Sequence, residues 1–169
     1  MEQSGSSLGS YPKGRWFKSN SRYNIGSMNT KRIGNIGEAL AISEFVKRGI
    51  PVYIPFGENE KADLIADFNG KLNRIQCKTS DGCVKDGVID WRLVTVTYHN
   101  VHRYTKSEVD YFALYNVKYN IHILIPFEDI KGRQSLYVSV DCKPPRNSKN
   151  PIIWKQYTFD KILGTQPEV

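Results

Sequence analysis

An Asn-Gly pair, Asn69-Gly70, constrains the fold of this chain more than any other feature of its sequence. Both residues tolerate the positive φ of a type I′ turn, so the pair predicts a tight β-hairpin between its flanking segments. These two strand-like segments span residues 63–68 and 71–78. A two-residue loop fixes the strand register, and counting outward from the turn places Asp63 opposite Gln76.

Three polar residues stand where the hairpin strands would otherwise be apolar: Asp63, Gln76 and Lys78. Side chains alternate between the two faces of a strand, so Lys78 shares a face with Gln76 and its partner Asp63. A carboxylate, an amide and an ammonium group are therefore expected to converge at the end of the hairpin away from its turn. By themselves these residues are equally compatible with a solvated sheet face, where polar side chains are common.

A helix is expected upstream of the hairpin, from residue 29 or 30, where Asn or Thr can cap it, to Arg48. Gly34 and Gly37 are unusual inside a helix, because each costs about 1 kcal/mol relative to Ala. We interpret them as points where a neighbouring strand or a phosphate approaches the helix backbone closely. Glu38 lies on this helix, and packing of the helix on the sheet would bring its carboxylate to the hairpin.

The order of the predicted elements indicates one mixed β-sheet flanked by helices, of α/β or α+β class. Further strands are expected at residues 51–56, 88–97, 110–117 and 120–125, and a short helix at residues 159–163. Residues 98–106 are interpreted as a basic, aromatic connection between strands. We expect residues 29–169 to form one domain, preceded by a flexible basic arm at residues 1–28.

The chain carries a net charge of +7, and its basic residues are concentrated near the N-terminus. Residues 1–32 contain six basic residues and one acidic residue, together with several aromatic side chains. Lys and Arg pair with phosphates and aromatic rings stack on bases, so this composition suits a nucleic acid. The candidate DNA contacts are Lys13, Arg15, Lys18, Arg22, Lys31, Arg32, Arg74, His99, Arg103 and Lys106. A solvated basic tail is the alternative interpretation of the N-terminal segment.

Composition and cysteine usage narrow the cellular setting. No segment approaches the roughly 20 apolar residues of a membrane span, and no apolar core of a signal peptide is present near the N-terminus. The three cysteines lack the spacing of a disulfide framework. We therefore expect a cytoplasmic or otherwise intracellular protein, with neither a membrane partner nor an organic cofactor. His99 and His102, taken with Cys77 and Cys83, miss the usual spacings of structural zinc sites.

The oxygen atoms expected near the open end of the hairpin suit a hard divalent cation such as Mg²⁺ or Mn²⁺. The candidate ligands are the carboxylates of Glu38 and Asp63, the amide oxygen of Gln76 and the backbone carbonyl of Cys77. A cation of this kind lowers the pKa of a bound water and stabilises charge on a phosphate. Lys78 would orient or deprotonate that water, or neutralise charge in the transition state.

In this order, the motifs resemble the PD-(D/E)XK nuclease superfamily, with residues 76–78 as a Gln-Xaa-Lys variant. The sequence is similar in particular to the endonucleases encoded in group I introns that use this fold. The similarity covers about residues 31–130. By position, Glu38 and Asp63 correspond to metal ligands, and Ala62 replaces the usual proline. Gln76 takes the place of the usual acidic residue, and Lys78 corresponds to the catalytic lysine.

The resemblance implies a restriction-endonuclease-like core and a metal-dependent endonuclease of the homing type, which hydrolyses phosphodiesters at specific sites in duplex DNA. Cutting both strands needs two active sites, so a homo-oligomer, either a dimer or a tetramer, is implied. A Holliday-junction resolvase or a restriction-type nuclease would use the same residues. A DNA-binding module that does not cut is a further alternative, because Gln76 removes one negative charge from the metal site.

Overall fold

The computed structural model describes residues 29–57, 59–84, 87–98, 100–143 and 151–164. The predicted arm at residues 1–28 and the candidate DNA contacts Lys13, Arg15, Lys18, Arg22 and His99 lie outside the described residues. Within the described segments, no helix is both long enough and apolar enough to cross a membrane. The three cysteines are unpaired.

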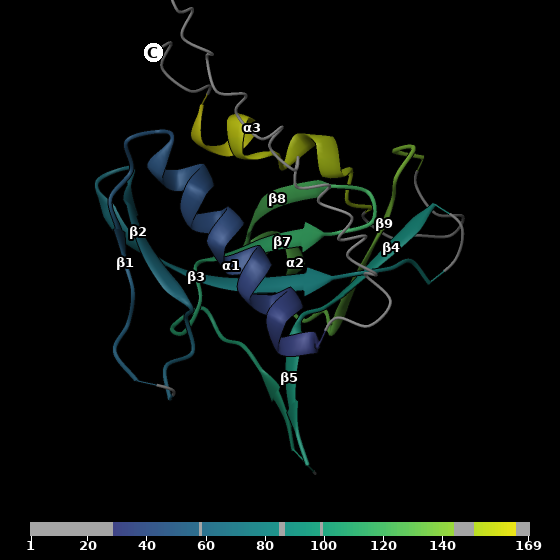
Figure 1. The fold of residues 1–169 in the computed structure, drawn as a ribbon, viewed down its shortest axis with the longest axis horizontal. Coiled ribbons are helices and arrows are strands. Elements are labelled where there is room, and N and C mark those ends of the chain that lie inside the picture. Colours follow the sequence, from purple (N-terminus) through teal and green to yellow (C-terminus); the bar gives the residue numbers. More distant parts are fainter. Residues whose placement is uncertain (1–28, 58, 85–86, 99, 144–150, 165–169) are drawn as a thin grey trace, which may run out of the picture.

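A five-stranded mixed sheet with the strand order β1-β2-β3-β7-β8 forms the centre of the structure (Figure 1). Its strands are β1 (Val52–Tyr53), β2 (Leu64–Phe68), β3 (Lys71–Ser80), β7 (Tyr111–Asn116) and β8 (Ile121–Pro126). Strands β3 and β7 run parallel, whereas the other neighbours are antiparallel. The sheet is flanked by helices, so the predicted fold class is confirmed.

The β2–β3 hairpin has the turn and register that the Asn-Gly pair predicts. Asn69 and Gly70 adopt φ values of 55° and 69°, as a type I′ turn requires. Phe68 pairs with Lys71 across the turn, and the register continues outward along both strands. The backbone N–H of Asp63, the residue before β2, donates to the carbonyl of Ile75 at 2.9 Å, and Ile75 is also the partner of Leu64.

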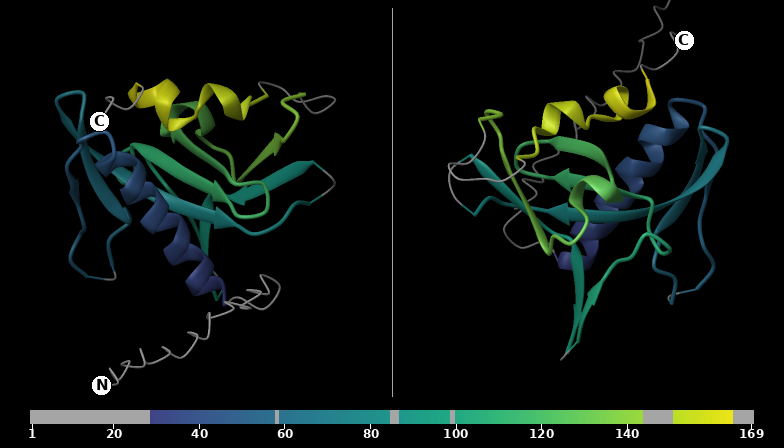
Figure 2. Two further views of the ribbon diagram at one scale, coloured as in Figure 1. Left: turned by 45° about the horizontal axis from the view of Figure 1, so that its top comes forward. Right: turned by 180° about the vertical axis from the view of Figure 1, so that it is seen from behind.

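Helix α1 (Thr30–Val46) lies across one face of the sheet, as Figures 1 and 2 show. The side chain of Asn29 caps it by accepting a hydrogen bond from the backbone N–H of Lys31 at 3.0 Å. Gly37 is buried against β3, and a Cβ placed there would lie 1.9 Å from Thr79 Oγ1. A neighbouring strand therefore approaches the helix at Gly37. At Gly34, a Cβ would meet no described atom within 4 Å.

Replacing these two helical glycines should change stability in opposite directions. Gly37→Ala is expected to lower the free energy of unfolding by about 1–3 kcal/mol, because the new methyl group overlaps the Thr79 side chain. Gly34→Ala should raise it by about 0.5–1 kcal/mol, because alanine favours the helix and the added methyl group is unobstructed. Urea denaturation of both variants measures this, and equal effects would contradict the close approach at Gly37.

The opposite face of the sheet is covered by a second apolar layer. Strands β4 (Val88–Arg92) and β9 (Ser135–Ser139) pair antiparallel, and helix α2 (Phe127–Ile130) follows β8. Trp91 is buried in this layer together with Phe112 and Leu114 of β7. The predicted single strand over residues 88–97 is wrong in one respect, because the chain leaves β4 at Leu93 and begins a separate strand.

That separate strand, β5 (Val94–Thr97), pairs with β6 (Asn100–Arg103) in a two-stranded ribbon. The ribbon projects from the body of the protein in Figure 1 and in the right-hand view of Figure 2. Residues 98–106, interpreted above as a connection, therefore contain half of a hairpin. Tyr98 at its tip has a φ of 41° and is fully exposed. Tyrosine is not a residue that signals a positive φ, which explains why the hairpin escaped prediction.

Helix α3 (Phe159–Leu163) and the 3₁₀ helix η2 (Trp154–Gln156) lie beside β8, and the predicted short helix at residues 159–163 is confirmed. Arg48 joins α1 to α3 through ion pairs with Glu44 and Asp160. His122 of β8 packs on the ring of Phe159, with centroids 4.5 Å apart. Its Nε2 is buried without a hydrogen-bond partner among the described residues. Burial lowers the pKa of His122 to about 4, against the attraction of Glu44.

The buried imidazole should make stability depend on pH. Because the unfolded chain binds a proton at His122 near pH 6.5 and the folded chain only near pH 4, acidification through this window favours unfolding. The free energy of unfolding should fall by about 2 kcal/mol more in the wild type than in His122→Met between pH 7 and 4. Urea titrations across that range test this, and parallel pH profiles for the two proteins would contradict it.

Candidate active site

The side chain of Asp63 is held at the open end of the hairpin by two hydrogen bonds. Its Oδ2 accepts from Gln76 Nε2 at 2.5 Å and from the backbone N–H of Cys77 at 2.6 Å. The hairpin register pairs Leu64 with Ile75, and this brings Asp63, the residue before β2, beside Gln76 and Cys77 of β3. The structure therefore brings together the carboxylate and the amide that the sequence predicted to meet.

The electrostatic environment connects Asp63 with Glu38 of α1. Burial raises the pKa of Asp63, although the Cys77 N–H, the Lys78 charge and the Gln76 amide all act to lower it. Burial also raises the pKa of Glu38, and the negative charge of Asp63 raises it further. The two carboxylates therefore lie within interaction range, as expected from packing of α1 on the sheet. Their mutual repulsion favours a cation between them.

Cys77 turns its side chain away from this cluster and presents its backbone. The thiol is buried in the apolar layer beneath α1, with Ala41 and Ile75. Burial raises the pKa of this thiol well above its usual range, and the charges of Asp63 and Glu38 raise it further. The carbonyl oxygen of Cys77 accepts a hydrogen bond from Gln76 Nε2 at 3.3 Å. That oxygen is therefore beside the Asp63–Gln76 pair.

Lys78 lies on the same strand face as Gln76, two residues further along β3. Its positive charge lowers the pKa of both Asp63 and Glu38, so the ammonium group is close to the carboxylates. Lys78 Nζ donates to the hydroxyl of Tyr104 at 3.2 Å and lies 3.5 Å from Thr95 Oγ1. Neither hydroxyl was identified from the sequence as part of the site.

A cleft of about 370 Å³ opens in front of these groups. Three elements line it: the β2–β3 hairpin, the β5–β6 ribbon and the chain leading into β2. The lining residues are Glu60, Lys61, Asp63, Gln76, Lys78, Thr95, Thr97, His102 and Tyr104. The alternation of valine and threonine over residues 94–97 is a strand signal that could have located the ribbon. Its position beside the cleft depends on tertiary packing.

Three of the predicted DNA contacts lie at one end of the molecule. Lys31 and Arg32 are exposed on the first turn of α1, which has no acidic residue. Arg103 is exposed at the base of the β5–β6 ribbon. Figures 1 and 2 agree in showing the N-terminal end of α1 beside this ribbon. These cations therefore lie on adjoining elements although they are distant in sequence.

Two other predicted DNA contacts, Arg74 and Lys106, form ion pairs with a buried carboxylate. Asp110 is 1% exposed and accepts from the side chain of Arg74 at 2.9 Å and from its backbone N–H at 3.0 Å. Lys71 and Lys106 approach the same carboxylate at 2.9 and 3.6 Å. Burial opposes ionisation of Asp110, but these partners hold its pKa well below the usual range. Asp110 thus joins β3 to the start of β7.

Removing the Asp110 charge should destabilise the fold. Asp110→Asn leaves three cations and a backbone N–H without their carboxylate, and the free energy of unfolding should fall by about 2 kcal/mol. Asp141→Asn is the matched control, because Asp141 is exposed and pairs with the exposed Lys143. Urea denaturation measures both variants. An Asp110→Asn midpoint as high as that of the control would show that the ion pairs do not stabilise the fold.

Among the described residues, no group of three or more His, Cys, Asp or Glu side chains is placed to hold a metal ion. The metal ligands predicted from the sequence are not a group of that kind, because only two of them are carboxylate side chains. These are Glu38 and Asp63, and the Gln76 amide and the Cys77 carbonyl complete the oxygen donors. The fit of this set to a cation therefore depends on its neutral donors as much as on its charges.

Comparison with known proteins identifies the family to which the chain belongs. The family model for PD-(D/E)XK endonuclease matches residues 28–162. The chain therefore belongs to the PD-(D/E)XK endonuclease family, and the predicted resemblance is confirmed.

The fold is similar to that of a solved bacterial homing endonuclease, I-Ssp6803I. The two chains are 20% identical, with a TM-score of 0.56, and the match covers 76% of this chain and 86% of the other. This similarity confirms the restriction-endonuclease-like core. No match was found among curated proteins.

Proposed function

We propose that this protein is a metal-dependent endonuclease that cuts duplex DNA at specific sites, of the homing type. The observation that supports it best is the cluster around Asp63, which Gln76 and the Cys77 backbone hold in place within range of Glu38 and Lys78. The chain belongs to the PD-(D/E)XK endonuclease family, and the resemblance of its motifs to that family is what assigns catalytic roles to these residues. Glu38, Asp63, Gln76 and Lys78 are the proposed catalytic set.

The donor chemistry of the cluster fits Mg²⁺ or Mn²⁺. Glu38 and Asp63 supply two carboxylates whose charges repel each other in a partly buried setting, and the Cys77 carbonyl supplies a third oxygen. Gln76 directs its amide nitrogen at Asp63 and at the Cys77 carbonyl. Rotating the amide group by about 180° would exchange its nitrogen and oxygen, so that the oxygen would lie beside Asp63 and the Cys77 carbonyl. Such a cation, when bound, would make a water ligand more acidic and stabilise charge on the scissile phosphate.

Lys78 is proposed to act directly on the reacting phosphate. Its ammonium group lies beside the carboxylates and faces the cleft that would receive the DNA backbone. A positive charge fixed there stabilises the charge that gathers on the phosphate in the transition state, or orients the attacking water. Because Gln76 is neutral, Glu38 supplies the second negative charge that the usual acidic residue would provide.

Duplex DNA is proposed to lie across the N-terminal end of α1, the β5–β6 ribbon and the cleft. A two-stranded ribbon has dimensions that fit the major groove, and Arg103 at its base is placed for a phosphate or a base edge. Lys31 and Arg32 would bind phosphates at the helix end. Arg74 and Lys106 remain predicted DNA contacts, although their ion pairs with Asp110 offset part of their positive charge. The basic residues of the N-terminal arm are proposed to add phosphate contacts to a domain spanning residues 29–169.

Cleavage of both strands requires a second catalytic centre, because the described chain contains one such cluster. A homodimer or a tetramer of this chain would supply it. A symmetric assembly would place two clusters on a pseudo-palindromic site, as symmetric DNA-binding proteins do.

The first experiment exposes supercoiled and randomised duplex DNA to the purified protein with Mg²⁺ and sequences the resulting ends. Discrete breaks at one motif are expected, and EDTA should abolish them. Lys78→Ala should lower the cutting rate at least about 100-fold while changing DNA affinity by no more than a few fold, because its charge acts in the chemical step. Lys131→Ala is the matched control, since Lys131 is exposed and pairs only with Glu128 among its described ion-pair partners.

Three other results would replace this proposal. Cutting by Lys78→Ala at the normal rate would show that the site is misassigned. Cleavage of four-way junctions regardless of their sequence would identify a resolvase. Salt-sensitive binding of duplex DNA without cutting, in Mg²⁺ and in Mn²⁺, would identify a DNA-binding module that does not cut.

A further inference from the structure

The ammonium group of Lys78 is held by two hydroxyl groups that belong to another part of the fold. Lys78 Nζ donates to Tyr104 at 3.2 Å and lies 3.5 Å from Thr95 Oγ1. The two hydroxyl oxygens are themselves 2.7 Å apart, so they share a hydrogen bond. Nζ also lies 5.2 Å from the centre of the Tyr104 ring. Three side chains therefore form one polar group at the wall of the cleft.

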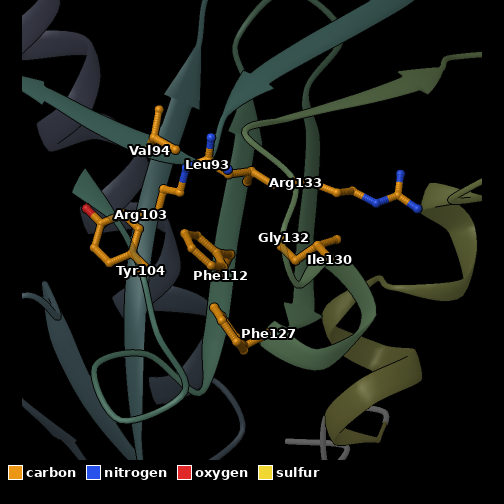
Figure 3. A pocket seen from close by; sticks show the side chains of 9 residues that line it. All are labelled: Leu93, Val94, Arg103, Tyr104, Phe112, Phe127, Ile130, Gly132 and Arg133. Atoms are coloured by element: carbon orange, nitrogen blue, oxygen red, sulfur yellow. The ribbon is translucent and has the colours of Figure 1, made fainter. Parts of the chain in front are cut away.

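The hydroxyl of Tyr104 has a position set by the apolar core. Its ring packs edge-to-face on Phe112 of β7, with centroids 5.5 Å apart, and on His102 at 5.3 Å. Figure 3 shows this ring beside Phe112 at a small pocket, with the hydroxyl pointing away from the pocket. Packing of the ring thus fixes where the hydroxyl lies, and Lys78 bonds to a rigid acceptor.

Thr95 and Tyr104 both lie at the base of the β5–β6 ribbon. Thr95 is in β5 and pairs with His102 of β6, and Tyr104 follows directly after β6. Among the described strands, β5 and β6 pair only with each other. The hydrogen bonds to Lys78 therefore link the ribbon to the central sheet at the candidate catalytic cluster.

An ammonium group has three N–H donors. Two of them are directed at the ribbon hydroxyls, which leaves the third for the cleft and the carboxylate side. Without these acceptors, the flexible four-carbon stem of lysine would let the charge sample many positions. A catalytic charge acts best when its position is established before the reaction.

We propose that Tyr104 and Thr95 are positioning residues, which hold the Lys78 ammonium group toward Asp63 and so align the β5–β6 ribbon with the catalytic centre. This inference rests on the proposed role of Lys78 in cleavage. It assigns the two hydroxyls a function in the chemical step and none in DNA affinity. The ribbon that is proposed to contact DNA and the lysine that is proposed to act in cleavage are then joined directly by hydrogen bonds.

Removing each hydroxyl tests the proposal. Tyr104→Phe keeps the packed ring, and its single-turnover cleavage rate should fall about tenfold while the DNA Kd stays within about twofold. Thr95→Val should likewise lower the cleavage rate and leave the DNA Kd nearly unchanged. Thr95→Ser, which restores the hydroxyl, should recover most of the rate. Tyr137→Phe is the matched control, because Tyr137 is an exposed tyrosine on β9. Wild-type rates in Tyr104→Phe, or equal losses in Thr95→Val and Thr95→Ser, would overturn the proposal.

A second measurement separates this inference from the proposed function. In protein with labelled lysines, the Lys78 Cε–Hε resonance, assigned by its absence in Lys78→Ala, should move in Tyr104→Phe and remain in place in Tyr137→Phe. An unmoved resonance would overturn the positioning role whether or not the protein cuts DNA. A shifted resonance in a protein that cuts no DNA would support the hydroxyl contacts while the proposed endonuclease activity fails.

Discussion

The register of the β2–β3 hairpin is the constraint on which the candidate site depends. The type I′ turn at Asn69-Gly70 sets the pairing from Phe68 with Lys71 to Leu64 with Ile75, and the Asp63 carboxylate meets the Gln76 amide just beyond it. A slip of one residue would move Gln76 and Lys78 to the opposite face of the sheet. The same strand supplies the Cys77 N–H, which fixes the Asp63 carboxylate from the backbone. A local turn thus determines which hairpin residues belong to the cluster, and the packing of α1 adds Glu38.

The cluster holds charges that would repel each other in the absence of a compensating cation. Burial raises the pKa of both Asp63 and Glu38, and the negative charge of Asp63 raises the pKa of Glu38 further, whereas the charge of Lys78 acts to lower both. Asp110 shows the contrasting case, since three cations stabilise its ionised form. Asp110 is therefore satisfied by cations within the fold, whereas Asp63 and Glu38 keep raised pKa values and are the carboxylates that we propose bind a divalent cation. The two sets of carboxylates thus differ in their electrostatic setting: Asp110 belongs to an ion-pair network, and the pKa values of Asp63 and Glu38 are perturbed in the way that functional sites often show.

Several features of the fold follow from short segments of sequence, and others do not. The cap at Asn29, the close approach at Gly37 and the helix at residues 159–163 depend on local signals, and each lies where it was predicted. The β5–β6 ribbon was missed because its tip has Tyr98 in a left-handed conformation without a glycine to mark it. β9 and α2 were also missed, because short elements that complete a layer depend on the surface they cover.

By itself, the sequence determined the turn, the helix and the alternation that sets Asp63, Gln76 and Lys78 together, because these depend on backbone preference and on the period of a strand. It also determined the family, through motifs in a defined order. Only the tertiary structure decided that Thr95 and Tyr104 hold the lysine and that Asp110 engages Arg74. Those contacts join β3 to segments about 20 to 40 residues away, and the packing of layers, which no local preference specifies, places them side by side.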